Sequence, residues 1–176
     1  MKDGKFELAD ISIVKLSKIH DLSKFDCADN DLNDFLKNDA LTYQEKKLVT
    51  TTLLVYQEKV IGFFSMCSDS IRLQEEEKEN CDIHKPLREY PAVKFARLAV
   101  DKEFQSKNLG KLIIKLVIGL VINEFSERVA CRFITVDSYS NKVSFYQLFS
   151  FIENTDRHYK KDNYVSMRFD LLNPYN

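Results

Sequence analysis

A short polar segment in the middle of the chain has the residue types of an anion-binding loop. Residues 105–111 read Gln-Ser-Lys-Asn-Leu-Gly-Lys and open directly into an apolar helical pattern. The first N–H groups of a helix have no partner within it, and the helix dipole favours negative charge at that end. We therefore predict that the backbone amides of this loop hold a phosphate or a similar anion. The alternative is an ordinary strand–turn–helix with a polar turn.

Two regular elements must position this loop. Before it, residues 93–100 (VKFARLAV) are apolar and β-branched, as in a buried strand. After it, apolar residues recur at helical spacing, namely Leu109, Leu112, Ile113, Leu116, Val117, Leu120 and Val121. This spacing predicts a helix that packs one face on a sheet.

The strand and loop together resemble the acyl-coenzyme A signature of the GNAT N-acetyltransferases, whose usual form is Gln/Arg-x-x-Gly-x-Gly/Ala. In that family the loop amides hold the coenzyme pyrophosphate, and the strand splays from its neighbour to admit the pantetheine arm. The chain departs from the signature at Asn108, where the first glycine is expected. Asparagine tolerates left-handed backbone angles better than most residues, so we expect the loop to keep its shape.

A second part of the resemblance lies further along the chain. Residues 136–151 contain Val-Asp, Asn141, Ser-Phe-Tyr146 and Ser-Phe, which are similar to the family's VDA…N…A-x-FY…GF segment. In that pattern the asparagine is a helix cap that contacts coenzyme A, and the tyrosine stands beside the coenzyme's sulfur. Serines replace small apolar residues or glycine at Ser138, Ser144 and Ser150.

The resemblance implies acetyl-coenzyme A as the cosubstrate and identifies the residues that would contact it. These are Leu98, Ala99, Val100, Gln105, Ser106, Lys107, Asn108, Leu109, Gly110, Lys111 and Asn141. It also implies a catalytic role for Tyr146.

The implied reaction has defined physical needs. A primary amine attacks the thioester carbonyl, an oxyanion forms, and the coenzyme leaves as a thiolate. By analogy with the family, a backbone N–H group near Leu98 to Val100 stabilises the oxyanion. Tyr146, whose ordinary pKa is about 10, can donate a hydrogen bond to the thiolate and can protonate it where the site favours transfer. The alternative is a helix tyrosine that only packs on the sheet edge.

Each of three cations in or before the loop has two alternative roles. Lys107 and Lys111 could meet phosphate oxygens as point charges, but lysines on an exposed helix face are usually just solvated, so the loop amides rank above them. Arg97 either orients the acceptor or projects into solvent.

The acceptor can be argued from amine ionisation. A lysine ε-amine, with a pKa of about 10.4, is almost entirely protonated at pH 7, whereas roughly a tenth of an α-amine is neutral. The resemblance places no carboxylate or histidine as a base at the acceptor site, which favours an α-amine such as that of a charged tRNA. Basic candidates for contacting RNA are Lys46 with Lys47, Lys85 with Arg88, and residues 157–161, although scattered solvated lysines are the alternative.

One branch of the GNAT family adds a partner to these expectations. Residues 25–36 (FDC-x-x-x-x-LN-x-FL) resemble the first helix of a branch that includes the toxins of bacterial toxin–antitoxin pairs, although an amphipathic helix with a capped start explains the same spacing. A toxin-like role predicts acetylation of aminoacyl-tRNA and a small antitoxin partner. The competing possibility is acetylation of small-molecule amines or peptides. A homodimer is a further expectation. A non-catalytic regulator that keeps the fold and binds a partner protein or RNA is the alternative, because Asn108 interrupts the signature.

Composition sets the broad class. The chain has 176 residues, 44% of them hydrophobic and 30% charged, a net charge of −1 and a pI near 6.3. These values indicate a folded protein without a global basic field for nucleic acid. The cysteines form no CxxC pair and the histidines are scattered, so we expect free thiols and no metal site. We find no signal peptide or membrane span and expect a cytoplasmic location.

The remaining patterns predict an α/β fold in a single domain over residues 1–176, which the resemblance implies is an N-acetyltransferase domain. Strands are expected at 11–16, 50–56, 60–67, 131–136 and 163–171, and helices at 30–47 and 141–149. Residues 57–59 would close a hairpin, residues 74–80 would form an exposed loop or short helix, and residues 137–141 would turn and cap. The strand at 131–136 should run parallel to the strand ending at Val100, because a helix joins them. This order suits a mixed sheet with helices on both faces, and the resemblance to the GNAT family implies that its parallel strands splay.

Overall fold

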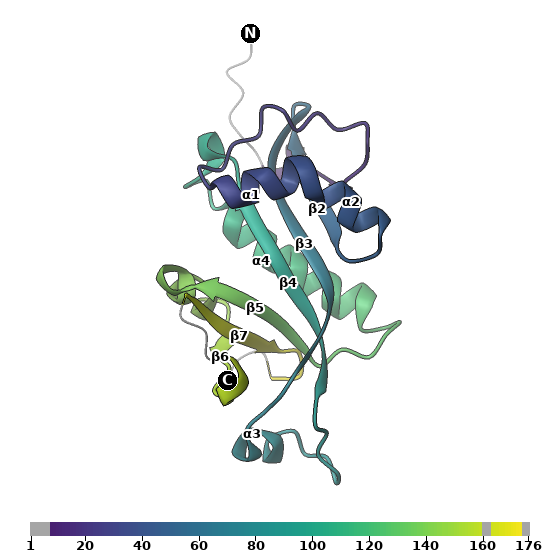
Figure 1. Ribbon diagram of the computed structural model, residues 1–176, viewed down its shortest axis with the longest axis vertical. Helices are drawn as coiled ribbons and strands as arrows, with labels where there is room; N and C mark the ends of the chain where they lie inside the picture. Colours follow the sequence, from purple (N-terminus) through teal and green to yellow (C-terminus); the bar gives the residue numbers. More distant parts are fainter. Residues whose placement is uncertain (1–7, 160–162, 174–176) are drawn as a thin grey trace. The chain divides into compact units, whose positions relative to one another are not determined.

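The computed structural model describes residues 8–159 and 163–173 (Figure 1). The contacts within the chain divide it into two compact units. Unit 1 comprises residues up to 66 and residues 97–113, and unit 2 comprises residues 67–96 and those from 114 onward. Strands β3 (Lys59–Ile71) and β4 (Tyr90–Val100) and helix α4 (Leu109–Leu120) each begin in one unit and end in the other. The strands form one sheet in the order β1 (Ser12–Lys15), β2 (Thr50–Tyr56), β3, β4, β5 (Phe133–Tyr139), β7 (Tyr164–Asp170) and β6 (Ile152–Glu153). The predicted mixed α/β sheet is therefore confirmed. The single domain over residues 1–176 stays a prediction.

Unit 1 contains an antiparallel arrangement followed by the loop segment. Its further elements are β1 (Ser12–Lys15), α1 (Asn30–Asp34), a π-helical turn (Phe35–Asp39), α2 (Ala40–Glu45) and β2 (Thr50–Tyr56). Strand β2 pairs antiparallel with both β1 and β3. Helix α1 begins where the Asp29 carboxylate accepts a hydrogen bond from the Leu32 N–H, which makes Asp29 its N-cap.

The hairpin between β2 and β3 is tighter than predicted. Only Gln57 and Glu58 link the strands, with φ of 47° and 64°, whereas a three-residue link was expected. Two left-handed residues in succession match the turn geometry that follows the twist of paired strands. Lys59 therefore belongs to β3.

Helical residues pack on both faces of β3 within unit 1. The Phe63 ring stacks on Phe35 of the π-helical turn, with centroids 6.1 Å apart. The neighbouring Gly62 faces the other way, and a Cβ built on it would lie 3.5 Å from Cδ1 of Ile113 in α4. Because successive strand residues alternate between faces, these contacts confirm the predicted helices on both faces of the sheet.

Unit 2 contains the parallel pair. Its further elements are α3 (Glu75–Glu79), β5 (Phe133–Tyr139), α5 (Val143–Gln147), β6 (Ile152–Glu153) and β7 (Tyr164–Asp170). Strands β4 and β5 pair in parallel, as predicted, but only from Ala92 to Lys94. Beyond that point β5 continues to Tyr139 while paired with β7. The parallel ladder therefore ends before either strand does, as the predicted splay requires.

Two boundaries in unit 2 correct the sequence-based expectations. Residues 137–139 were expected to form a turn, yet they extend β5, because they pair in register with Tyr164 to Ser166 of β7. The ladder outweighs the turn preference of Asp137 and Ser138. The predicted helix at 141–149 is confined to Val143–Gln147, after a 3-10 turn over Ser140–Lys142. The acidic run before Cys81 contains α3, so the short-helix alternative is correct.

The apolar face of α4 is rotated slightly from the predicted stripe. Its fully buried members are Leu109, Ile113, Ile114 and Val117, whereas Leu112 and Leu116 are half-buried. No helix within residues 8–159 and 163–173 combines the length and apolarity that a membrane crossing requires.

Candidate functional site

The loop before α4 has two residues with left-handed backbone angles. Ser106 has φ of 66° and Asn108 has φ of 60°. The expectation that Asn108 would adopt the conformation of the missing glycine is therefore confirmed. The angle at Ser106 was not predicted.

The loop presents backbone donors in the way that an anion requires. The Asn108 carbonyl accepts the N–H of Leu112 at 3.1 Å, so the helix ladder starts here. The N–H groups of Leu109, Gly110 and Lys111 belong to the first turn, where a helix offers them no acceptor. Residues 106–108 are exposed. The loop thus fits a phosphate group approaching the start of a twelve-residue helix.

The two loop lysines differ in their surroundings. The Lys107 ammonium lies 4.5 Å from the centre of the Phe104 ring, in cation–π contact, whereas Lys111 is exposed on α4. The Lys107 side chain is thus held against the neighbouring Phe104 ring, whereas the Lys111 side chain is on the solvent side of the helix.

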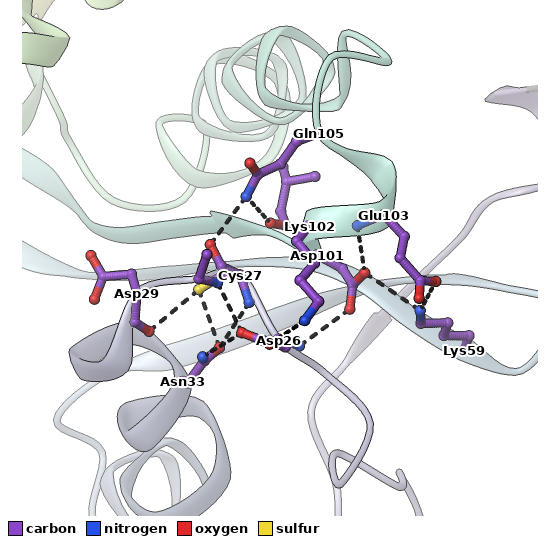
Figure 2. A network of polar contacts seen from close by, with 11 residues as sticks. Asp26, Cys27, Asp29, Asn33, Lys59, Asp101, Lys102, Glu103 and Gln105 are labelled. Carbon is purple, nitrogen blue, oxygen red and sulfur yellow. Dashed lines mark hydrogen bonds and ion pairs between the residues drawn. The ribbon is translucent and has the colours of Figure 1, made fainter.

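Gln105 directs its side chain into the protein. Its amide nitrogen donates to the carbonyl oxygens of Cys27 and Val100, both at 3.1 Å (Figure 2). The side chain therefore ties the loop to the FDC segment, defined here as residues 25–29, and to the end of β4. These two bonds engage the side-chain N–H donors of Gln105, so a phosphate that leaves them intact can be met only by the backbone N–H of this residue.

Sequence reasoning missed Asp101, which follows β4 and is 1% exposed. Its carboxylate accepts hydrogen bonds from the N–H groups of Asp26 at 3.2 Å and Glu103 at 3.1 Å, and the Lys59 ammonium lies 3.4 Å away (Figure 2). A signal was present in the sequence, because an aspartate directly after a strand often caps the turn that follows, as Asp101 does for the 3-10 turn Lys102–Phe104.

The end of β4 is closely packed in unit 1. A Cβ on Gly62 would lie 3.1 Å from the Ala99 carbonyl oxygen, and the N–H of Asp101 donates to the Ile61 carbonyl at 2.9 Å. Leu98 and Val100 are half-buried. The residues expected near the oxyanion are therefore held tightly against β3.

Arg97 does not project freely into solvent, so that alternative is wrong, whereas a role in orienting the acceptor stays a prediction. Its guanidinium lies 4.2 Å above the centre of the Phe35 ring, and Nε is buried without a hydrogen-bond partner among the described residues. The side chain is therefore packed in unit 1 and does not project freely into solvent.

Tyr146 is buried among aromatic rings in unit 2. It lies on α5, is 9% exposed, and contacts Phe95, Phe145 and Phe151 at centroid distances of 6.5, 5.3 and 5.6 Å. This burial raises the pKa of the Tyr146 phenol to about 12. The hydroxyl is therefore neutral at physiological pH and available as a hydrogen-bond donor.

Asn141 is exposed in the 3-10 turn and does not cap α5. That helix begins at Val143, and its N-cap position is Lys142, whose side chain makes no capping bond. The structure thus brings the residues of the loop together in unit 1 and places Asn141 and Tyr146 in unit 2.

A family model described as an acetyltransferase (GNAT) domain matches residues 21–171. The chain belongs to the GNAT acetyltransferase family. It is accordingly an N-acetyltransferase with acetyl-coenzyme A as its cosubstrate.

Solved structures share this acetyltransferase fold. A mutant of KacT is 20% identical, with a TM-score of 0.79 over 93% of this chain and 96% of that one. AtaT complexed with acetyl-methionyl-tRNAfMet is 22% identical, with a TM-score of 0.78 over 92% and 95% of the two chains. AtaTR bound with acetyl-coenzyme A is 22% identical, with a TM-score of 0.77 over 94% and 96%.

Proposed function

We propose that this acetyltransferase transfers an acetyl group to the α-amine of an aminoacyl-tRNA, as a toxin-like enzyme. The observation that carries the proposal is the fold shared almost end to end with AtaT, which was solved with acetyl-methionyl-tRNAfMet. That molecule is the product expected from acetylation of a charged tRNA on its amino acid.

The proposed chemistry uses a direct attack. The neutral amine forms a C–N bond with the acetyl carbonyl, the C–S bond breaks, the nitrogen loses a proton, and the leaving thiolate takes one up. The N–H groups near Leu98 to Val100 are proposed to stabilise the oxyanion. Coenzyme phosphates are proposed to lie on the amides of residues 105–111, with Asn141 as a further contact.

Tyr146 acts in this proposal as a hydrogen-bond donor to the departing sulfur. A phenol with a pKa of about 12 is a much weaker acid than a thiol of pKa about 8 to 9, so complete proton transfer to the thiolate is unfavourable in the free enzyme. Donation of a hydrogen bond carries no such cost. The solved neighbours include variants of KacT and AtaT in which a tyrosine is replaced by phenylalanine. These variants support testing the same replacement at Tyr146.

The carboxylates beside β5 favour an acceptor that needs little help from a base. Asp137 is paired with the Lys94 ammonium at 2.9 Å, and Asp69 accepts the Thr135 hydroxyl at 2.5 Å. Both groups are therefore engaged in stabilising contacts within unit 2. An α-amine, about a tenth neutral at pH 7, is better suited to such a site than a lysine ε-amine.

Partners follow from the same neighbours. AtaT has been solved with the C-terminus of the antitoxin AtaR, and KacTA with DNA, which supports a small antitoxin partner for this chain. For RNA, Lys46, Lys47, Lys85 and Arg88 are all exposed. In the third predicted patch, Lys160 and Lys161 lie outside the described residues. A homodimer stays a prediction.

The test is an acceptor competition. The purified protein would be incubated with acetyl-coenzyme A, a mixture of charged tRNAs and a lysine-containing peptide, followed by mass spectrometry of the aminoacyl-adenosine ends and the peptide. Acetylated aminoacyl ends with an unmodified peptide are expected. Acetylation of the peptide alone would overturn the proposed acceptor, and no acetylation with intact coenzyme binding would favour the non-catalytic regulator.

A further inference from the structure

The FDC segment has no part in the acetyl transfer described above, yet it is bound to the chain just before the loop. The Lys102 N–H donates to the Asp26 carbonyl at 2.8 Å, and the Lys102 ammonium meets the Asp26 carboxylate at 2.8 Å (Figure 2). In return, the Asp26 N–H donates to the Asp101 carboxylate. All of these residues belong to unit 1.

Asn33 of α1 fixes the other side of the FDC segment. Its side-chain oxygen accepts the Cys27 N–H at 2.9 Å and the Cys27 thiol at 3.2 Å, while its amide nitrogen donates to the Asp26 carboxylate at 2.9 Å. One asparagine thus satisfies both neighbouring residues of the segment. The spacing of the FDC-x-x-x-x-LN run places Asn33 on the first turns of α1, where it can reach back to them.

Charge strengthens this arrangement at Asp26. The Lys102 ammonium, the Ala28 N–H and the Asn33 amide together hold the pKa of the Asp26 carboxyl well below its ordinary value. Asp26 is therefore ionised at physiological pH, and its bond with Asn33 is charge-assisted.

The loop that follows needs such support. A left-handed conformation is unfavourable for residues with a Cβ, and Ser106 and Asn108 both adopt it. Gln105, immediately before them, bonds to the Cys27 carbonyl and so joins the loop to the FDC segment. A continuous path of hydrogen bonds therefore runs from Asn33 through Cys27 and Gln105 to the loop.

We propose that Asn33 and Gln105 are positioning residues. Through the FDC segment they hold the loop at residues 105–111 in the conformation that binds the coenzyme pyrophosphate. The proposal rests on the function assigned to residues 105–111 under the proposed reaction. It gives the FDC run a role in cosubstrate affinity, although none of its residues needs to touch the coenzyme.

The variant Asn33→Asp tests this role, because it keeps the shape of the side chain but replaces the donor to Asp26 with a second carboxylate. The matched control is Asn38→Asp in the following helical turn, where the Asn38 amide donates to Asp34 at 2.7 Å on the exposed surface. Gln105→Glu is a second variant, which removes the donor to two carbonyls from an exposed residue. Its control is Gln57→Glu in the β2–β3 turn.

The measurement is titration calorimetry with acetyl-coenzyme A and with S-acetylpantetheine, which lacks the pyrophosphate. Loss of one bond in the network should weaken acetyl-coenzyme A binding about tenfold in each test variant, with S-acetylpantetheine affinity changed by less than about twofold. The controls should match the wild type for both compounds.

Each other outcome has a defined meaning. Equal weakening for both compounds would indicate general damage and overturn the positioning role. Unchanged affinities in a folded Asn33→Asp or Gln105→Glu protein would overturn it as well. If wild-type protein binds both compounds equally well, the loop does not hold the pyrophosphate, and the assignment on which the proposal rests is wrong. The wild-type comparison therefore separates the two failures.

Discussion

Raising the pH should destabilise the wild-type protein more than its Tyr146→Phe variant. In the unfolded chain Tyr146 ionises with a pKa of about 10, whereas in the folded protein burial raises the pKa to about 12. Between these values the unfolded state has lost the proton and the folded state keeps it. Ionisation therefore favours unfolding as the pH rises.

The size of this effect follows from the two pKa values. The free energy of unfolding should fall by about 1.4 kcal/mol per pH unit across this interval, or roughly 2 to 3 kcal/mol in total. The phenylalanine variant keeps the ring packing against Phe95 and Phe151 but has no proton to lose.

Urea unfolding from about pH 8 to pH 12 gives the free energy of unfolding of both proteins. Subtracting one from the other removes the contributions of ionisable groups that the two proteins share. Tyr43→Phe is the matched control, because the Tyr43 ring also packs edge-on against a phenylalanine but is 41% exposed. It should track the wild type. Parallel curves for the wild type and Tyr146→Phe would refute the burial argument.

Two further predictions concern backbone geometry. Gly62→Ala should destabilise the protein by about 1 to 3 kcal/mol, since its Cβ would press on a backbone oxygen. Gly119→Ala should instead stabilise α4 by about 0.5 to 1 kcal/mol, because only a flexible side chain lies within 4 Å of its Cβ, at 3.9 Å. Thermal unfolding compares them, and equal effects would contradict the packing. Asn108→Val should destabilise the loop by about 1 to 2 kcal/mol, and Asn108→Gly should not. Calorimetry with acetyl-coenzyme A should show weaker binding for the valine variant only; unchanged binding there would show that the left-handed angle is dispensable.

Much of the fold could be predicted because its elements combine hydrophobic periodicity with clear end signals. The strand at Thr50–Tyr56 is an example, and it is where the pattern places it. The predictions failed where pairing partners distant in sequence decided the outcome. Residues 137–139 became strand because β7 was available, which their local turn preference could not show.

The candidate site was predictable in its local parts. Asn108 could be assigned a left-handed conformation because few other residue types accept it. The network around Asp101 could not be predicted, because it joins Asp26 to a segment 75 residues away through backbone groups that carry no sequence signal. The inward orientation of Gln105 depends on the same long-range contact.

The most direct test of the account is the acetyl-transfer rate of Tyr146→Phe at saturating acetyl-coenzyme A, measured on charged tRNA beside the wild type. Loss of one preorganised donor should lower kcat by about 100-fold or more. The Kd for acetyl-coenzyme A should stay within about twofold, because the phenylalanine ring preserves the packing of α5. A kcat equal to that of the wild type would show that the Tyr146 hydroxyl has no part in the reaction.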